Sequence, residues 1–232
     1  MEWFQTWSAD FCDTFTRCFI KDNRYMLLLD GIGVTIRVSL VAVLIGIAIG
    51  LLIALCNLSS NKILKLIGGI YTDVIRGTPS VTQLMIIYFV IFASVNLSKW
   101  IIAAIAFGIN SGAYVSEIIR AGILSVDKGQ TEAGRSLGLS ASQTMTRIVI
   151  PQAVKNIFPA LCNEFIVLIK ETAIVGYVGL MDIQKAGDFI KSATFEAFMP
   201  LIGTAIIYYV LIKILTLVLN RIESRLRASE VR

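Results

Sequence analysis

Long apolar stretches, separated by short polar segments, dominate this chain. A membrane-spanning helix needs about 20 mostly apolar residues. Stretches of this kind occur at Val38–Asn61, Gly77–Ser98, Ile101–Ser116, Asn156–Met181 and Ala197–Asn220. The fourth carries Glu164, Lys170 and Glu171, and the fifth is interrupted only by Lys213. The pattern predicts an all-α membrane protein with five spans, the first beginning near Gly33.

Composition narrows the class further. Of 232 residues, 56% are apolar and 16% are charged, whereas a soluble domain carries about 25% charged residues. Disordered chains have the opposite character, with low hydrophobicity and high charge. The sequence has no histidine, which excludes histidine-based acid–base catalysis and histidine metal ligation. No close pair occurs among the four cysteines, so we expect neither a disulfide framework nor a metal site: Cys12, Cys18, Cys56 and Cys162.

The distribution of basic residues predicts the orientation. Most Lys and Arg residues fall on one side if the segment Ala121–Asn156 is cytoplasmic, as the positive-inside bias requires. With five spans, the N-terminus is then outside and the C-terminus inside. Residues 1–30 become an external segment with no cleavable signal peptide, either an interfacial helix or a loosely ordered tail. Residues 31–222 form the transmembrane domain, with a cytoplasmic loop at about 121–156, and 223–232 form a tail.

Small residues recur at every fourth position in two of the predicted spans. The two stripes are Ala42, Gly46, Gly50, Ala54 and Ala104, Gly108, Gly112, Ser116. Such stripes let helix backbones approach closely in lipid. We expect them to pack helices within one subunit, and the alternative is a seam between two subunits.

The cytoplasmic loop has a helical pattern of its own. Thr131 is predicted to cap a first short helix, which Gly138 interrupts. Ser140 is predicted to cap a second helix, which runs until Pro151 breaks it before the fourth span. From these features alone, the loop is equally compatible with a docking surface for another protein and with a simple connection.

The loop also resembles a known motif. Glu132-Ala133-Gly134, Gly138, Ile148 and Ile150-Pro151 match the spacing of the EAA motif (EAA-x3-G-x9-I-x-L-P) of importer-type ATP-binding-cassette (ABC) permeases. Gly134 replaces the second alanine of the motif, and glycine loosens a helix slightly; Ile150 replaces leucine. Three further stretches resemble the polar amino acid permease family (histidine/glutamate/glutamine/arginine/opine type): Arg76–Leu84, Ser111–Ile123 and Asn163–Thr172. The resemblance covers roughly Tyr25–Arg227.

The resemblance implies a fold and a set of partners. The fold is the MetI-like permease fold of type I ABC importers, in a multi-pass protein of the bacterial inner membrane. The partners are a cytoplasmic ATPase dimer, a second permease subunit (identical or different), an extracytoplasmic amino acid-binding protein and an amino acid substrate in a lipid bilayer, with no nucleic acid. In the family, the segment Glu132–Gly138 fits a groove of the ATPase, so coupling is assigned to Glu132, Ala133, Gly134, Gly138, Ile148 and Pro151.

The chain lacks the residues of a nucleotide site. A phosphate-binding loop needs a Gly-Lys dipeptide, and the sequence contains none. We therefore expect no cofactor and no enzymatic activity in this chain, with ATP and Mg²⁺ bound by the partner ATPase.

Polar residues within the predicted spans are candidates for substrate binding. Glu164 and Glu171, seven residues apart, share one helix face, and Asn163 and Lys170 share another. Asn110, Tyr114 and Glu117 line one face of the third span. A zwitterionic amino acid needs an anion near its ammonium group (Glu117, Glu164 or Glu171) and donors near its carboxylate (Arg76, Thr78 or Lys170). The alternative is a structural network in which Lys170 pairs with a glutamate.

Thr78-Pro79 has the form of a helix start, with Thr78 as the cap and Pro79 at the first position. It is predicted to divide a longer helix that begins near Ile63, which gives a discontinuous span. Helix N-termini inside transporters favour anionic groups, so a substrate carboxylate near Thr78 is one interpretation. A simple cap at the membrane boundary is the other.

The sequence thus predicts the permease subunit of an ATP-driven amino acid importer. An alternative is a secondary transporter or channel driven by an ion gradient, which predicts inverted internal repeats. A membrane enzyme is a further alternative, and it would need a catalytic constellation that this chain does not suggest.

Overall fold

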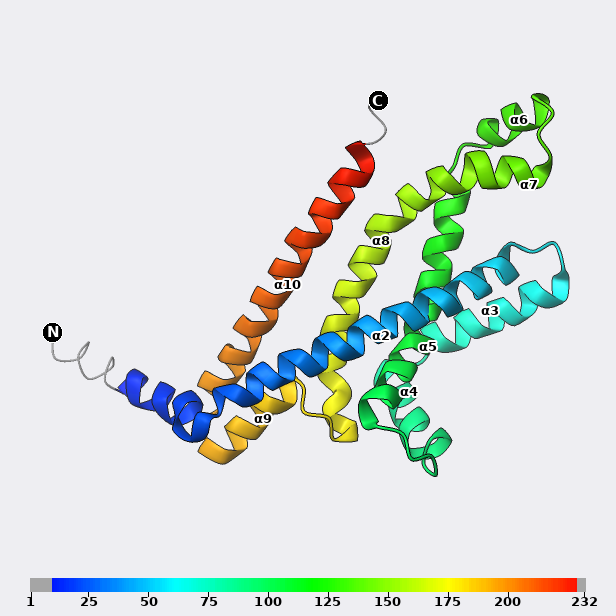
Figure 1. Ribbon diagram of the computed structural model, residues 1–232. Helices are drawn as coiled ribbons and strands as arrows, with labels where there is room; N and C mark the ends of the chain where they lie inside the picture. The colour runs from blue at the N-terminus through cyan, green and yellow to red at the C-terminus, as the bar shows by residue number, and fades with distance from the viewer. Residues whose placement is uncertain (1–9, 229–232) are drawn as a thin grey trace.

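The computed structural model describes residues 10–228, and all regular elements in this range are helical. The main helices are α2 (Tyr25–Leu58), α3 (Lys62–Arg76), α4 (Ser80–Ile86), α5 (Lys99–Leu124), α6 (Lys128–Ser136), α7 (Ala141–Thr144), α8 (Ile150–Glu171), α9 (Ile183–Thr194) and α10 (Phe198–Ala228). Shorter turns are η1 (Thr16–Ile20), η2 (Lys21–Asn23), η3 (Ile87–Ile91), η4 (Met145–Val149) and η5 (Thr172–Val178). The predicted all-α class is confirmed. Figure 1 shows the short helices α6 and α7 at one end of the long helices and α9 at the other.

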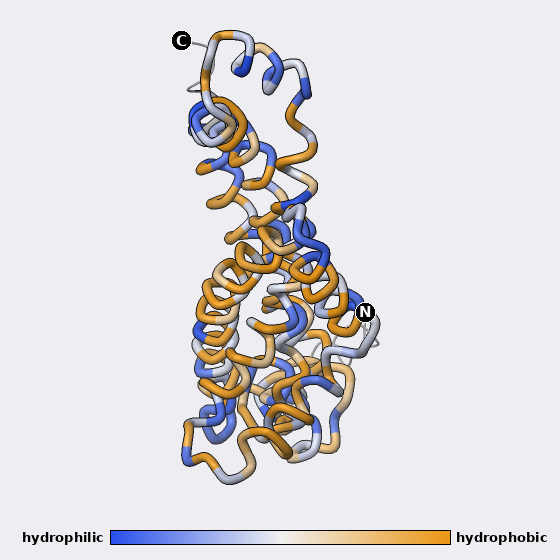
Figure 2. Tube along the Cα trace, turned by 90° about the vertical axis from the view of Figure 1, so that its right-hand side faces the viewer, coloured by the Kyte–Doolittle hydropathy of each residue, from blue (hydrophilic) through white to orange (hydrophobic). Residues whose placement is uncertain are grey.

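Three helices of the described chain are long and apolar enough to cross a membrane: α2, α5 and α10 over Phe198–Arg225. A fourth candidate is the pair formed by α3 and Ser80–Ile91, which bends by 104° at its break. The predicted division of a longer helix near Thr78-Pro79 is confirmed, and within the predicted stretch Gly77–Ser98 the helix covers Ser80–Ile91. The fourth predicted stretch coincides largely with α8, whose charged residues lower its hydropathy. Figure 2 shows that the long helices are largely hydrophobic. The count of five spans and the placement of the termini remain predictions.

The first spanning helix is longer than the sequence predicted. α2 begins at Tyr25 rather than near Gly33 and contains 34 residues. The charges of Asp30 and Arg37 do not end it. At about 1.5 Å per residue it is roughly 50 Å long, well over a hydrocarbon layer of about 30 Å. Figure 1 shows it running obliquely past α5 and α8.

The contact between α2 and α5 is the most extensive between any two helices, and the small-residue stripes form it. All eight stripe residues are buried. A Cβ atom added to Gly46 would lie 2.9 Å from Ser111 Oγ, and one added to Gly108 would lie 2.5 Å from Ile45 Cγ2. Backbones this close tolerate no side chain, so the prediction of packing within one subunit is confirmed.

The described part of the N-terminal segment packs against the N-terminal end of α10. Phe19 lies over Gly203, whose added Cβ would be 2.8 Å from Phe19 Cζ. Arg17 forms an ion pair with Glu196 at 2.5 Å. Residues 10–23 are largely helical, in agreement with the helical option. Their place at a membrane surface stays a prediction, and residues 1–9 lie outside the described part.

Candidate functional site

The two short helices between α5 and α8 form a projecting unit, which we call the elbow (residues 127–149: α6, α7 and η4). It lies beyond the ends of the long helices (Figure 1). α6 begins at Lys128, and Asp127 caps it by accepting a hydrogen bond from Gly129 N at 2.6 Å. The predicted start at Thr131 is therefore wrong. The Asp127 carboxylate satisfies a free N–H group one turn earlier, which leaves Thr131 inside the helix.

The turn of the elbow follows the sequence prediction. Gly138 has a φ of +84°, a left-handed conformation that glycine adopts without strain. Ser140 then caps α7 in a capping box, accepting from Gln143 N at 3.2 Å while Gln143 Oε1 accepts from Ser140 N at 2.9 Å. The interruption at Gly138 and the cap at Ser140 are both confirmed.

The predicted break at Pro151 does not occur. α7 continues through the π-helical turn η4 directly into α8, and Pro151 lies in the first turn of α8. The wider turn of η4 changes the hydrogen-bond register before the proline arrives, and a missing N–H costs little in a first turn. The elbow is therefore joined to α8 by continuous helix.

Gly134 has a packing role that the sequence did not indicate. It is buried, and an added Cβ would lie 2.8 Å from Ile148 Cδ1 and 2.9 Å from Thr144 Cγ2. α6 thus crosses closely over η4. This close contact explains why Gly134, which is smaller than alanine, stands at the position of the second alanine of the motif. Glu132 and Ala133 are exposed, and Leu137 at the tip is 83% exposed. The outer surface of the elbow carries the Glu132 carboxylate and an apolar tip, together with three exposed basic residues, Lys128, Arg135 and Arg147.

The base of the elbow is tied to both neighbouring helices. Asn156 Nδ2 on α8 donates to Ser125 Oγ at the end of α5, at 2.9 Å. Gly122 on α5 lies directly against Ile157 on α8. The two helices that flank the elbow are therefore joined to each other at its base.

A second group of polar residues lies at the break between α3 and α4. Gln83 Nε2 donates to Ile75 O and to Thr78 Oγ1, both at 2.7 Å, and Gln83 Oε1 accepts from Asn110 Nδ2 on α5 at 2.9 Å. Thr78 Oγ1 in turn donates to Val74 O at 2.9 Å. Thr78 therefore closes α3 rather than capping α4, and its predicted role as an N-cap is wrong. Thr78 Oγ1 accepts from the side chain of Gln83 on α4, and no backbone N–H group of α4 donates to it.

Gln83 is the residue of this group that sequence reasoning did not place in a site. A glutamine in an otherwise apolar stretch was the available signal. It is only 8% exposed, and a buried amide needs hydrogen-bond partners.

Three more candidates lie on α3 and α5: Arg76, Tyr114 and Glu117. The Arg76 guanidinium lies over the Tyr114 ring, 5.5 Å from its centroid. Glu117 forms a salt bridge with Arg120 at 2.7 Å. Both residues of that bridge line a cleft of about 460 Å³ between α5 and the turn that joins α2 to α3.

The four candidates on α8 are less closely associated. Glu164 is buried and accepts a hydrogen bond from Ser111 Oγ on α5 at 2.7 Å, and Ser111 was not among the predicted site residues. Asn163 and Lys170 are exposed, and Glu171 is half-buried. Within residues 10–225, Lys170 forms no ion pair with Glu164 or Glu171, so the predicted structural pairing of Lys170 with a glutamate does not occur here. The structure brings the α3–α5 candidates together and links α8 to them only through Ser111 and Glu164.

The described cysteines form no disulfide, and no cluster of metal-ligating side chains occurs among the described residues.

Comparison with known proteins places these features in context. The sequence profile of the family described as "Binding-protein-dependent transport system inner membrane component" matches residues 46–228. The arginine transport system permease protein of Bacillus subtilis is 41% identical over 205 residues, covering 88% of this chain and 94% of that protein. A crystal structure of an amino acid ABC transporter with histidines contains a chain of 44% identity, with a TM-score of 0.81, covering 89% of this chain and 98% of that one. The inward-facing MetNI methionine ABC transporter, at 18% identity and a TM-score of 0.74, shares the fold over 87% of this chain.

Proposed function

Because this chain belongs to the family of binding-protein-dependent transport system inner membrane components, we propose that it is the permease subunit of an ATP-driven importer of polar amino acids. The relatives named above are permeases or complexes of amino acid ABC transporters. This agreement favours an ABC permease over a transporter or channel driven by an ion gradient.

The elbow is the observation that carries the proposal. It presents Glu132, Ala133 and Leu137 to solvent on a unit that is continuous with α8, and α8 is itself hydrogen-bonded to the end of α5. Such a unit suits a groove in a separate cytoplasmic ATPase, which binds ATP and Mg²⁺. Closure of the ATPase moves the elbow, and the elbow moves the helices of the path.

The path for the substrate follows the polar residues between α3, α4, α5 and α8. Arg76 and Thr78 lie at the bend, with Asn110, Tyr114 and Glu117 on the facing side of α5, while α8 contributes Asn163, Glu164, Lys170 and Glu171. Both charge signs occur along this route, as a zwitterion requires. Polar side chains inside a membrane face a cavity or a partner, which supports a wet path here.

The remaining partners follow from the sidedness of the elbow. If the ATPase dimer docks on the elbow, the C-terminus is also cytoplasmic and α9 faces the outside of a bacterial inner membrane, where a binding protein delivers the substrate. α10 is scarcely buried, since only 6% of its 18-residue apolar stretch is buried within the subunit. A second permease subunit, identical or different, completes the path.

The test is reconstitution of the permease with its ATPase and binding protein in liposomes. We expect ATP-dependent accumulation of at least one of L-glutamine, L-glutamate, L-arginine and L-histidine, and none by the permease alone. Uphill transport by the permease alone contradicts the proposal.

A double substitution addresses the elbow itself. Glu132→Lys with Gly138→Leu reverses the exposed charge and strains the turn, so we expect it to abolish ATPase stimulation by the loaded binding protein while the subunit still inserts. The matched control is Lys62→Glu with Gly69→Leu, since Lys62 is exposed on α3 and no atom lies within 4 Å of a Cβ added to Gly69. Normal stimulation and uptake in the elbow variant contradict docking at this surface.

A further inference from the structure

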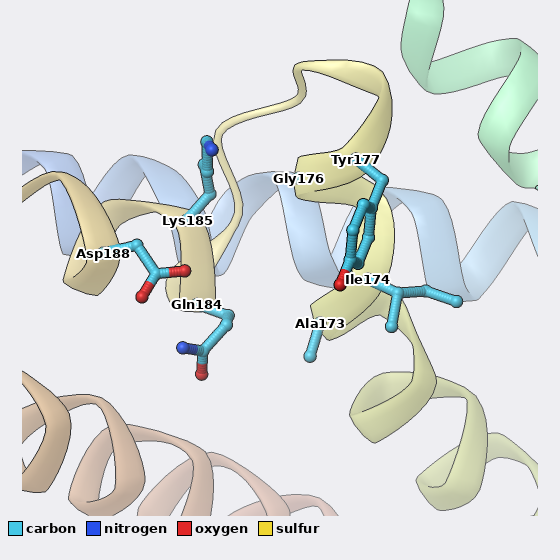
Figure 3. Close-up of a pocket in the computed structure, with 7 residues that line it drawn as sticks. All are labelled: Ala173, Ile174, Gly176, Tyr177, Gln184, Lys185 and Asp188. Atoms are coloured by element: carbon cyan, nitrogen blue, oxygen red, sulfur yellow. The ribbon is translucent and has the colours of Figure 1, made fainter. Parts of the chain in front are cut away.

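A hollow of about 500 Å³ lies between η5 and α9, at the end of the molecule opposite the elbow. Figure 3 shows its lining residues. Four of them are polar: Tyr177, Gln184, Lys185 and Asp188. The volume falls within the range of about 300–1,000 Å³ that is typical of small-molecule sites. None of the four was a candidate from the sequence, because the predicted binding residues were polar residues of the apolar spans and not of the segment between η5 and α9.

The polar groups of the hollow are free to bind a ligand. Within the described residues, the side chains of Tyr177, Gln184 and Lys185 form no hydrogen bond or ion pair with another residue. Lys191 Nζ donates to Asp188 Oδ1 at 3.1 Å, which leaves Asp188 Oδ2 available. Lys185 and Asp188 are three residues apart on α9, so their Cβ atoms are about 5–6 Å apart. Among the described residues, the α9 helix therefore carries the unpaired ammonium group of Lys185 and, one turn later, the carboxylate of Asp188 with one oxygen unbonded.

The α9 wall of the hollow is held rigidly. Asp182 is fully buried and caps α9, accepting from Lys185 N at 2.9 Å and from Gln184 N at 3.3 Å. Tyr208 on α10 donates its hydroxyl to Asp182 Oδ2 at 3.1 Å. The backbone that carries Gln184 and Lys185 is thus held in place by Asp182, which is in turn held by Tyr208 on the neighbouring helix α10.

The opposite wall positions the lysine. A Cβ atom added to Gly176 on η5 would lie 3.1 Å from Lys185 Cδ. The aliphatic part of Lys185 therefore lies close over a position without a side chain, while its ammonium group extends beyond. A charge whose stem is positioned in this way loses less entropy when it binds a ligand than a freely moving side chain does.

We propose that this hollow receives the amino acid on the outer side before it enters the interior, with Lys185 contacting its carboxylate and Asp188 its ammonium group. The inference rests on the proposed function, since only an importer has a substrate arriving at this end. The two charges contact main-chain atoms that all amino acids share, so the hollow accepts them with little regard to their side chains. Tyr177 and Gln184 add neutral hydrogen-bonding groups beside them.

The experiment uses the complete complex of permease, ATPase and binding protein in liposomes. It measures initial uptake of whichever of L-glutamine, L-glutamate, L-arginine and L-histidine the wild type accumulates, together with ATPase stimulation by the loaded binding protein. We expect Lys185→Met to lower the initial uptake rate about tenfold, as loss of a charge-assisted hydrogen bond predicts, with stimulation unchanged. Lys185→Arg keeps the charge and should retain most of the uptake. Lys21→Met, which removes an exposed lysine on η2 at the same end, is the matched control.

The outcomes separate the two proposals. Equal uptake by the wild type and Lys185→Met overturns the receiving site and leaves the importer intact. Loss of ATPase stimulation in Lys185→Met also overturns it, because the residue then serves contact with the binding protein. Equal losses in Lys185→Met and Lys185→Arg indicate a purely structural residue and overturn it as well. If the wild type accumulates none of the four amino acids, the proposed function itself fails.

Discussion

The α2–α5 contact and the elbow both depend on glycine, but for different physical reasons. Between α2 and α5, glycine removes side chains so that two backbones can touch, as at Gly46 and Gly108. At the turn of the elbow, Gly138 has no atom within 4 Å of an added Cβ and is needed only for its φ of +84°. The first region is a rigid contact, and the second is a shape held by local hydrogen bonds. At Gly138 the fold therefore has room for a side chain but not for a change in backbone conformation.

The largest effect is expected in the α2–α5 contact. Gly108→Val would place methyl groups inside Ile45, and overpacking of this kind costs about 3 kcal/mol. We expect a clearly lower melting temperature in detergent. Gly33→Val, on the partner helix α2 but with no atom within 4 Å of an added Cβ, is the control. Similar losses in both variants would show that helix propensity, and not the close contact, determines stability.

A smaller effect is expected at the turn of the elbow. Gly138→Val places a β-branched residue in a left-handed conformation, at a cost of about 1–2 kcal/mol. We expect reduced ATPase stimulation with nearly unchanged melting, because the strain stays in the elbow. Asparagine tolerates this conformation better, so Gly138→Asn should retain more stimulation. A greater loss in Gly138→Asn than in Gly138→Val would argue that the backbone conformation is not the cause.

The smallest effect is expected at the base of the elbow. Asn156→Ala removes the hydrogen bond to Ser125, which is worth about 1 kcal/mol. We expect a partial loss of uptake for each ATP hydrolysed, because α5 is then held less firmly to α8 and follows its movement less closely. Gln152→Ala, which removes a bond within one helix segment to Ile148 O, is the control. Identical coupling ratios in the two variants would contradict transmission through Asn156.

The sequence predicted what depends on local pattern and missed what depends on distant partners. The stripe of Gly46 and Gly50 predicted close packing, and Ser140 after Gly138 predicted a cap, because both signals are contained within a few turns. The start of α6 was predicted one turn too late because Asp127 and Thr131 both belong to the residue types that cap helices. The position at which α5 ends selects Asp127. The break at Thr78-Pro79 was predicted but its angle of 104° was not, since the angle depends on Gln83 bonding across to Thr78 and to Asn110 on another helix.

The candidate sites divide in the same way. The turn of the elbow at Gly138 and Ser140 was predicted because its motif is continuous in sequence. The hollow at α9 was not found, because its charged residues lie outside the apolar spans and become neighbours of Tyr177 only when α9 folds back beside η5. The burial of Asp182 beneath α9 likewise depends on Tyr208, 26 residues later.

The length of α2 links this protein to the lipid around it. A rod of roughly 50 Å fits a hydrocarbon slab of about 30 Å only by leaning or by protruding. Since α5 is locked along α2 by glycine, both lean as one body. A thinner bilayer tips them further and a thicker one draws them upright, so the acyl-chain length of the host membrane becomes a mechanical load on the transporter.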